Sequence, residues 1–195
     1  MQLENYYWCF HGAIPSRICD DIVAYGKELK EQAGVTFGYD PDNMTPNELK
    51  KVEKERSSNV VWMDPVWIYR ELHPLVHEAN ANAGWNFQWD YSESCQFTKY
   101  VGSKKQHYDW HTDSGPRKNE NGKIRKLSMT VALVDGSEYE GGDFAFSECT
   151  SPDPVVSKQK GTVLVFPSYL QHAVQPVTSG TRRSLVAWFE GPKWV

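Results

Sequence analysis

The second half of the chain consists of short apolar segments separated by turn residues, and this spacing constrains the fold more than any other feature. Five such segments follow residue 84: NFQWDYSESCQFTKYV, LSMTVALVD, GGDFAFSE, GTVLVFP and RRSLVAWFEG. Each has the length and the content of β-branched and aromatic residues that are typical of a strand. The spacing predicts an all-β sandwich or barrel over residues 85–195.

The first half, residues 1–84, is expected to supply helical support and a loop. Ser16 is predicted to cap a helix that ends near Gly34, and Asp64 is predicted to cap a second helix with Pro65 at its first position. Residues 36–58, which include the charged run KKVEKER, are expected to form an exposed loop or insertion. Helices that precede the strands favour one α+β domain, with the helices packed against a β core.

Composition restricts the classes of function. The chain has 195 residues and a formal net charge of −4, which gives no global indication of nucleic-acid binding. Its four cysteines form no C-x-x-C motif and are predicted to be free thiols of a reducing compartment. The sequence contains no apolar run of membrane-spanning length. We therefore expect a cytoplasmic protein without a membrane partner.

Two overlapping His-x-Asp pairs stand in the segment QHYDWHTDSG: His107 with Asp109, and His111 with Asp113. Residues two apart on a strand point to the same side, so either pair could present two metal ligands. His172, which follows the strand-like run GTVLVF, could supply a third. Two histidines and one carboxylate on one face can hold Fe(II) with open positions for substrate and O₂. The residues alone leave open which pair binds the metal, or whether neither does.

An arginine near the end of the chain provides a second indication. If RRSLVAWF is a strand, one face carries Arg182, Ser184, Val186 and Trp188. An arginine inside a barrel needs an anion, and its planar guanidinium suits a carboxylate. The Ser184 hydroxyl could add a hydrogen bond to that anion. The alternative is a surface salt bridge, for which the neighbouring Arg183 is the better candidate.

Four segments, in this order and spacing, carry a resemblance to a known family over about residues 90–192. They are YDWHTD (108–113), LSMTVALVDGSEYEGGDFAF, GTVLVFPSYLQHAVQPV and GTRRSLVAWFEGP. They match, in turn, a Y-x-x-H-x-D motif, two strands joined through an E-G-G turn, the strand before a distal histidine, and a G-x-R-x-S-L motif. The chain resembles the Fe(II)- and 2-oxoglutarate-dependent dioxygenases of the prolyl 4-hydroxylase-like branch.

The resemblance implies a double-stranded β-helix, or jelly-roll, core with N-terminal buttressing helices. It places the catalytic iron on His111, Asp113 and His172, and pairs Arg182 and Ser184 with the far carboxylate of 2-oxoglutarate. Asp113 runs directly into Ser-Gly-Pro, which agrees with a ligand pair at the strand's end. Tyr100 resembles the tyrosine that contacts the co-substrate, although it lies farther from His111 than in the family. Tyr108 is the alternative for that role.

The activity implied by the resemblance is hydroxylation of an unactivated C–H bond with O₂, with release of succinate and CO₂ and with ascorbate as an accessory reductant. A prolyl residue of a peptide or protein is the expected substrate. The alternatives are a nucleic-acid or small-molecule 2-oxoglutarate oxygenase and, in a different class, a non-catalytic jelly-roll binding module. Trp188 stands where nucleic-acid demethylases usually carry a second arginine, which argues against nucleic acid. The oligomeric state is not predicted.

The remaining candidates each have a structural alternative. His107 and Asp109 are predicted to lie deeper on the ligand face, where they could contact substrate, orient a ligand histidine, or simply be polar residues of an edge strand. Trp110 and Arg117 are further candidates for substrate contact. The loops 36–58 and 114–126 could act as lids or be solvated. His73 and His77 are expected to be a solvated pair, and four other tryptophans are expected in the core: 62, 67, 85 and 89.

Overall fold

The computed structural model describes residues 3–36, 39–40, 43–115 and 122–194. The helices in this part of the chain are α1 (Ser16–Glu28), α2 (Pro46–Glu55), α3 (Val66–Asn82) and α4 (Pro154–Ser157), with 3₁₀ turns at Gly102–Lys104 and Gly136–Glu138. The strands are β1 (Trp8–Phe10), β2 (Gln32–Ala33), β3 (Arg56–Ser57), β4 (Asn59–Met63), β5 (Tyr91–Ser92), β6 (Cys95–Val101), β7 (His107–His111), β8 (Ile124–Ala132), β9 (Tyr139–Gly141), β10 (Phe144–Phe146), β11 (Val163–Pro167), β12 (His172–Val174) and β13 (Val177–Gly191).

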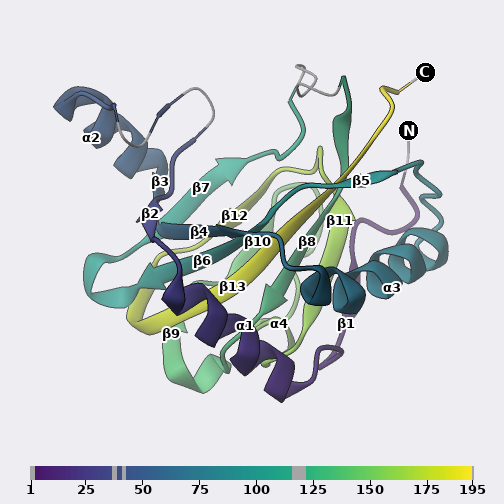
Figure 1. Ribbon diagram of the computed structural model, residues 1–195, viewed down its shortest axis with the longest axis horizontal. Helices are drawn as coiled ribbons and strands as arrows, with labels where there is room; N and C mark the ends of the chain where they lie inside the picture. Colours follow the sequence, from purple (N-terminus) through teal and green to yellow (C-terminus); the bar gives the residue numbers. More distant parts are fainter. Residues whose placement is uncertain (1–2, 37–38, 41–42, 116–121, 195) are drawn as a thin grey trace.

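Two antiparallel sheets form the core. The larger sheet has the path β1-β11-β8-β13-β6-β4-β2, and β5 and β9 also pair with β13. The smaller sheet has the order β10-β12-β7-β3. Figure 1 shows the long β13 crossing the molecule, and its residues pair with β8 on one side and β6 on the other. The predicted jelly-roll core with N-terminal helices is confirmed.

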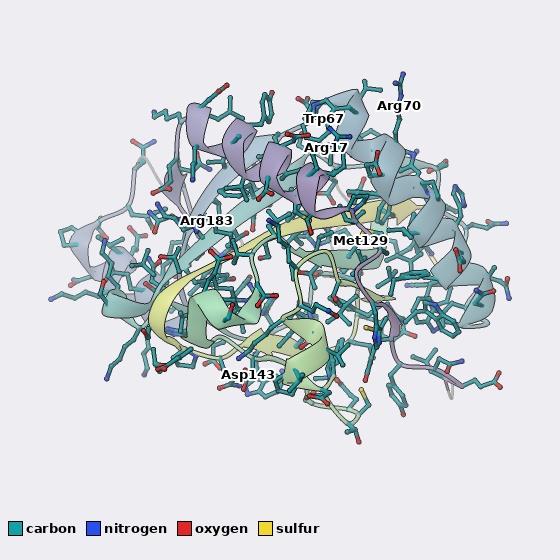
Figure 2. The ribbon with its side chains drawn as sticks, turned by 90° about the horizontal axis from the view of Figure 1, so that it is seen from below. Arg17, Trp67, Arg70, Met129, Asp143 and Arg183 are labelled. Carbon is teal, nitrogen blue, oxygen red and sulfur yellow. The ribbon has the colours of Figure 1, made fainter. Side chains whose placement is uncertain are left out.

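Helices α1 and α3 cover one face of the larger sheet, and Figure 2, seen from below, shows both helices along the upper side of the molecule with β13 beneath them. On α3 the buried residues recur every three or four positions: Ile68, Leu72, Val76 and Ala79. That spacing places them on one face of the helix, against core residues of β8 and β13 such as Met129 and Leu185. Burial of this apolar layer supports the sheet whose opposite face lines the site.

Both N-terminal helices have boundaries that differ from the prediction. Pro15 precedes α1, so Ser16 is its first residue and makes no cap. The helix ends at Glu28, well before Gly34, because Leu29 is extended and Gln32–Ala33 pairs with β4 as an edge strand. Asp64 does not cap α3 either, since Pro65 occupies the N-cap position. In both cases the rigid φ of proline sets the start of the helix.

Part of the segment predicted as a loop is ordered. Within residues 36–58, α2 begins with a capping box, in which the Thr45 hydroxyl accepts from the Glu48 backbone N–H and the Glu48 side chain accepts from the Thr45 N–H. The C-cap of α2 is Arg56, which continues into β3 and pairs with Tyr108. Figure 1 shows α2 at one end of the molecule, outside the main body of the sheets. The charged run KKVEKER is therefore mostly helix.

Two further predictions are wrong in part. Trp62 is 43 % exposed, whereas Trp67, Trp85 and Trp89 pack within or against the core. His73 is not solvated, because its Nε2 lies 3.0 Å from the Ser92 Oγ and its ring packs against Trp89 and Phe189. His77 is exposed but lies over Trp89, with ring centroids 4.5 Å apart. The four cysteines are free, as predicted.

Candidate metal centre and co-substrate pocket

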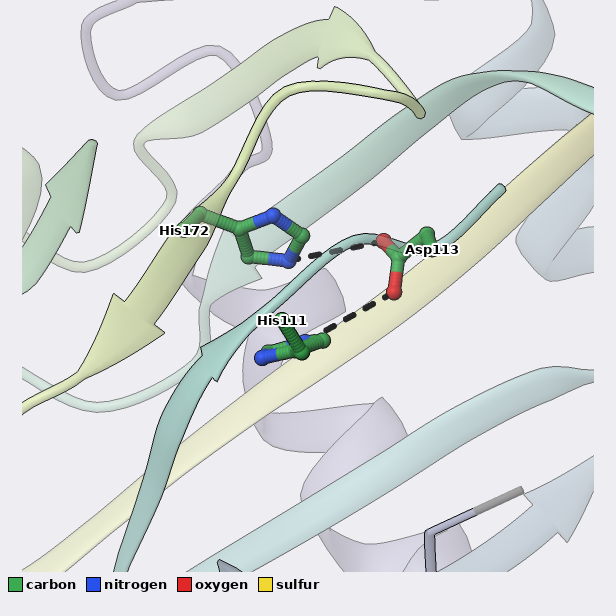
Figure 3. Close-up of side chains that lie close together, drawn as sticks. All are labelled: His111, Asp113 and His172. Carbon is green, nitrogen blue, oxygen red and sulfur yellow. Dashed lines mark ion pairs between the residues drawn. The ribbon is translucent and has the colours of Figure 1, made fainter. Parts of the chain in front are cut away.

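Two strands of the smaller sheet bring the predicted ligands together. His111 is the last residue of β7 and His172 is the first of β12, and the two are opposite each other in the antiparallel register. Asp113 follows two residues after His111, where its backbone N–H donates to the Ser168 carbonyl (2.9 Å). The three potential ligand atoms lie within 4.8 Å of one another. Figure 3 shows the three side chains converging on a single point.

Hydrogen bonds orient each of the three side chains. The Nδ1 of His111 donates to the Asp109 carbonyl (2.8 Å), and the Nδ1 of His172 donates to the Leu170 carbonyl (2.9 Å). Because each Nδ1 carries the proton, each Nε2 has a free lone pair. It lies 3.7 Å from the Asp113 carboxylate for His111 and 3.5 Å for His172, so all three side chains offer electron-donor atoms to one cation. These bonds fix the tautomers that metal binding requires.

Burial and neighbouring charges give His111 and Asp113 the protonation states that a cation site requires. Burial acts to raise the pKa of Asp113, but the nearby His172, His111 and Arg125 and the hydrogen bond from Ser128 outweigh it and lower that pKa to about 2. Burial, followed by the neighbouring His172, lowers the pKa of His111 to about 4. At neutral pH Asp113 is therefore ionised and His111 is neutral.

The donor set fits one class of metal. Two imidazoles and one carboxylate on one face, with the other face open, are the arrangement of non-haem Fe(II) oxygenases. Ser128 donates from its Oγ to the Oδ2 of Asp113 (2.7 Å), and Ser168 lies 2.9 Å from Ser128. This chain of hydroxyls holds Oδ2 of Asp113, the oxygen that also lies 3.5 Å from the Nε2 of His172. The residues present therefore fit a ferrous ion.

Arg182 lies in the same pocket, at its inner end. Its side chain is buried, and the Nη1 donates to the Ser184 Oγ (3.0 Å). Its Cζ lies 5.4 Å from the ring centroid of Tyr100, its register partner on β6. Among the described residues no carboxylate forms an ion pair with Arg182. A buried guanidinium in this setting fits the carboxylate of a bound anion.

A tight turn beside Arg182 explains one of the glycines of the E-G-G segment. Gly142 has a φ of +66°, and a Cβ built there would lie 3.0 Å from the Cδ of Arg182 and 2.9 Å from the Cγ2 of Val177. A side chain at this position would strain the backbone and press on the arginine. The glycine therefore preserves the space that Arg182 occupies.

The two candidate tyrosines have different positions. Tyr100 is next to Arg182, whereas the ring of Tyr108 stacks on His111 with a centroid distance of 3.4 Å. Burial raises the pKa of both phenols, that of Tyr108 to about 12. Both therefore keep their protons at neutral pH and can donate hydrogen bonds. Tyr100 is the one placed to contact an anion held by Arg182.

The first His-x-Asp pair faces away from the pocket, contrary to the prediction. The pairing of β7 with β12 shifts register between His172 and Val174, and Tyr108 and His111 both line the pocket. His107 instead lies against the α2 end, with its Nε2 3.1 Å from the Lys54 carbonyl. The exposed Asp109 carboxylate accepts from the Trp110 backbone N–H, and Trp110 is 42 % exposed. Arg117 lies outside the described residues.

Several pocket residues were not predicted. The lining also includes Arg56, Gln96, Thr98, Thr130, Phe144, Phe166 and Val174. Gln96 and Thr98 share a strand face with Tyr100, so alternation along β6 could have identified them. Arg56 had no such signal, because it ends a charged run that resembles a solvated surface.

Comparison with known proteins agrees with this site. Residues 95–190 match the family described as the 2OG-Fe(II) oxygenase superfamily. A PKHD-type hydroxylase of Synechococcus sp. (strain CC9311) is 37 % identical over 124 residues, which are 61 % of this chain and 54 % of that protein. A PKHD-type hydroxylase of Azoarcus sp. (strain BH72) is 40 % identical over 88 residues, which are 44 % of this chain and 38 % of that protein. The chain spans about half or less of the length of these relatives.

Solved structures show the same fold at low sequence identity. The viral collagen prolyl hydroxylase of Paramecium Bursaria Chlorella virus-1, in a 2OG complex, has a TM-score of 0.67 and 18 % identity, with 96 % of this chain and 97 % of that chain covered. A Pseudomonas putida prolyl-4-hydroxylase has a TM-score of 0.66 and 20 % identity, with coverage of 97 % and 95 %. The chain belongs to the 2OG-Fe(II) oxygenase superfamily, whose metal is Fe(II) and whose co-substrate is 2-oxoglutarate.

The structure also bears on the expectation about membranes. No helix in the described ranges has the length and the hydropathy needed to cross a bilayer.

Proposed function

We propose that the protein is an Fe(II)- and 2-oxoglutarate-dependent hydroxylase that acts on a prolyl residue of a peptide or protein. In the balanced reaction, 2-oxoglutarate, O₂ and the substrate C–H give succinate, CO₂ and the substrate C–OH. The observation that carries the proposal is the presence, in one pocket, of the His111, Asp113 and His172 triad and of Arg182, a buried guanidinium without a carboxylate partner among the described residues.

The iron, when bound, supplies the activation of O₂ that makes an unactivated C–H bond reactive. The chain's own residues hold and orient the reactants. His111, Asp113 and His172 would bind the metal from one side and leave the other side open. Arg182 and Ser184 would bind the far carboxylate of 2-oxoglutarate, with the Tyr100 hydroxyl as a further donor. The apolar residues Phe144, Phe166 and Val186 would exclude water from the reacting atoms.

The choice of a prolyl substrate is supported by similarity. The relatives are named PKHD-type hydroxylases, and the similar structures are prolyl hydroxylases. One of them, from Trichoplax adhaerens, is in complex with a peptide fragment of the hypoxia inducible factor oxygen degradation domain, with a TM-score of 0.67, 17 % identity, and 95 % of this chain and 84 % of that chain covered. A fold alone does not determine a substrate, so this choice needs its own test.

The test is succinate formation by protein loaded anaerobically with Fe(II) and 2-oxoglutarate and then exposed to O₂, with and without proline-rich peptides. Succinate that a peptide stimulates, together with a peptide product heavier by one oxygen atom, would support the proposal. Turnover that no peptide stimulates would support the oxygenase and reject the peptidyl substrate. A His111→Ala variant with full activity would contradict the ligand assignment, and absence of succinate would favour a non-catalytic binding module.

A further inference from the structure

A second arginine, Arg56, lies in the pocket that holds the metal centre and Arg182. Its side chain is only 6 % exposed, and it lines the same pocket. Each guanidinium nitrogen donates one hydrogen bond to a neutral acceptor: Nε to the Ser58 Oγ (3.0 Å), Nη1 to the Val35 carbonyl (3.1 Å) and Nη2 to the Gln96 Oε1 (2.7 Å). Within the described chain no carboxylate forms an ion pair with Arg56, so its buried charge has no counter-ion there.

Contacts through Tyr108 place this charge close to the metal ligands. The Cζ of Arg56 lies 4.4 Å from the ring centroid of Tyr108, and that centroid lies 3.4 Å from the centroid of the His111 ring. The guanidinium is therefore no farther from the imidazole than the sum of these two distances. Two of its five N–H groups remain for a ligand after the three hydrogen bonds above.

Arg56 and Arg182 donate to different side chains of the larger sheet. Arg182 donates to the Ser184 Oγ, whereas Arg56 donates to the Oε1 of Gln96, which also accepts from the Thr98 hydroxyl (3.2 Å). Burial raises the pKa of Tyr100, and the charges of Arg56 and then Arg182 oppose that rise, so the phenol lies near both arginines. One pocket therefore holds two buried guanidinium groups with different protein acceptors.

Trp188 provides an independent indication of a ligand in this pocket. It lines the pocket, is only 5 % exposed, and its indole Nε1 is a buried donor without a hydrogen-bond partner in the described residues. Its ring is held in place by Arg125, whose Cζ lies 3.9 Å from the ring centroid and which pairs with Glu93. A fixed, unpaired donor in a buried site is costly unless a ligand supplies the acceptor.

Trp188 also contacts a partly exposed aromatic residue. Trp62, which is 43 % exposed, lies 6.0 Å from Trp188 between ring centroids. Because Arg182 and Ser184 suit the far carboxylate of 2-oxoglutarate, the donors of Arg56 and Trp188 remain for a further ligand of the same pocket.

We infer that Arg56 and Trp188 bind a carboxylate of the primary substrate, carried by the prolyl residue itself as a chain terminus or by a neighbouring acidic residue. This inference rests on the proposed function and narrows its substrate class. The competing source of the same chemistry is the 1-carboxylate of 2-oxoglutarate, and the experiment separates the two.

The experiment is calorimetric titration of Mn(II)-loaded protein, in which no turnover occurs. The probes are two matched pairs of acetylated peptides. In the first pair, alanyl-proline carries a free carboxylate or a carboxamide terminus. In the second pair, an amidated prolyl peptide carries aspartate or asparagine after the proline. We expect the carboxylate member of one pair to bind at least tenfold more tightly than its neutral partner, because a charge-assisted hydrogen bond is lost with the charge.

Variants of single residues test which side chains cause the preference for the carboxylate peptide. Arg56→Gln should reduce the preference for the carboxylate to less than twofold, and Arg56→Lys should restore part of it. Trp188→Phe, which removes the N–H donor and keeps an aromatic ring, should weaken it. Arg183→Gln is the matched control, because Arg183 alternates to the face opposite Arg182. Circular dichroism and thermal melts verify that each variant is folded.

Titration with 2-oxoglutarate identifies the source of the carboxylate. The affinity for 2-oxoglutarate should change less than twofold in Arg56→Gln. If it weakens tenfold instead, Arg56 serves the co-substrate and the inference is wrong. Equal binding within both peptide pairs, or no binding of any peptide, also overturns it. Failure of the wild type to bind 2-oxoglutarate is a separate result that rejects the proposed function and leaves the peptide comparison to decide this inference.

Discussion

At the residue scale, the two arginines of the pocket are expected to have separable effects. Arg182 lies beside Ser184 and Tyr100. Its register partner on β6 is Tyr100, whereas Gln96 is the partner of Val186. Replacement of Arg182 by glutamine should raise the Kd for 2-oxoglutarate at least tenfold, since it removes a charge-assisted pair with the far carboxylate. The Kd for Mn(II), measured without co-substrate, should stay within twofold. Arg183→Gln should change neither constant, and a loss of Mn(II) binding in Arg182→Gln would show that the arginine acts through the metal ligands.

The pKa of His111 predicts a pH dependence of stability in the metal-free protein. Burial lowers its folded-state pKa to about 4 from the ordinary value of 6.5, so between these values the unfolded chain binds more protons than the folded chain. The free energy of unfolding should therefore fall as the pH drops from 6.5 toward 4, by about 3 kcal/mol at most. The lowered pKa of Asp113, about 2, adds a loss of the same sign below pH 3.8.

Urea denaturation at pH 7 and pH 4.5 measures this effect. His111→Gln should show a smaller loss of stability between the two pH values than the wild type, because glutamine does not titrate. An identical loss in both proteins would place the responsible group elsewhere. The comparison belongs to the metal-free state, since a bound cation would itself compete with protons.

At the element scale, α2 connects a local capping signal to the pocket. The capping box of Thr45 and Glu48 starts the helix, and Arg56 ends it and enters the site. Thr45→Ala should destabilise α2 by about 1 kcal/mol. Amide hydrogen exchange of residues 46–55 should then become about five times faster, while exchange in β8 stays unchanged. Lys50→Ala on the exposed side of the same helix is the control, and equal acceleration in both variants would contradict a capping role for Thr45.

The same element shows what the sequence could and could not predict. Strands such as β8 and β13 were predictable because alternation and β-branched residues are local signals. The helix α2 was missed because its capping box lies within a segment rich in proline and charge. The inward position of Arg56 depends on Gln96, forty residues later, and the turning of Tyr108 toward His111 depends on a register shift with β12. Neither long-range pairing has a counterpart in the local pattern.

At the scale of the whole molecule, the two faces of the larger sheet serve different purposes. One face packs against α1 and α3 through a continuous apolar cluster, and the other carries Arg182, Ser184 and Gln96 into the pocket. The triad itself was predictable from motif order, because each ligand lies at a strand end that the jelly-roll topology brings to one place. The other lining side chains were not predicted as a set, because six strands supply them: β3, β6, β8, β10, β11 and β12.

This division predicts that stability and ligand affinity can be changed independently. Leu72 is fully buried on α3, in the cluster behind the sheet, whereas Glu71 beside it is only partly buried. Leu72→Ala should lower the free energy of unfolding by about 2–5 kcal/mol, through lost burial and a cavity. Glu71→Ala should lower it by less than about 1 kcal/mol.

At a temperature where Leu72→Ala remains folded, its Kd values for Mn(II) and 2-oxoglutarate should match those of the wild type within twofold. The reason is that β8 pairs with β13 from Ser184 to Gly191, and this pairing holds the site in register even when the layer behind the sheet loses a side chain. Chemical denaturation and calorimetric titration on the same preparation provide both quantities. A large loss of 2-oxoglutarate affinity in the folded variant would mean that the helix layer determines the position of Arg182, and that the pocket cannot be treated as a property of the sheets alone.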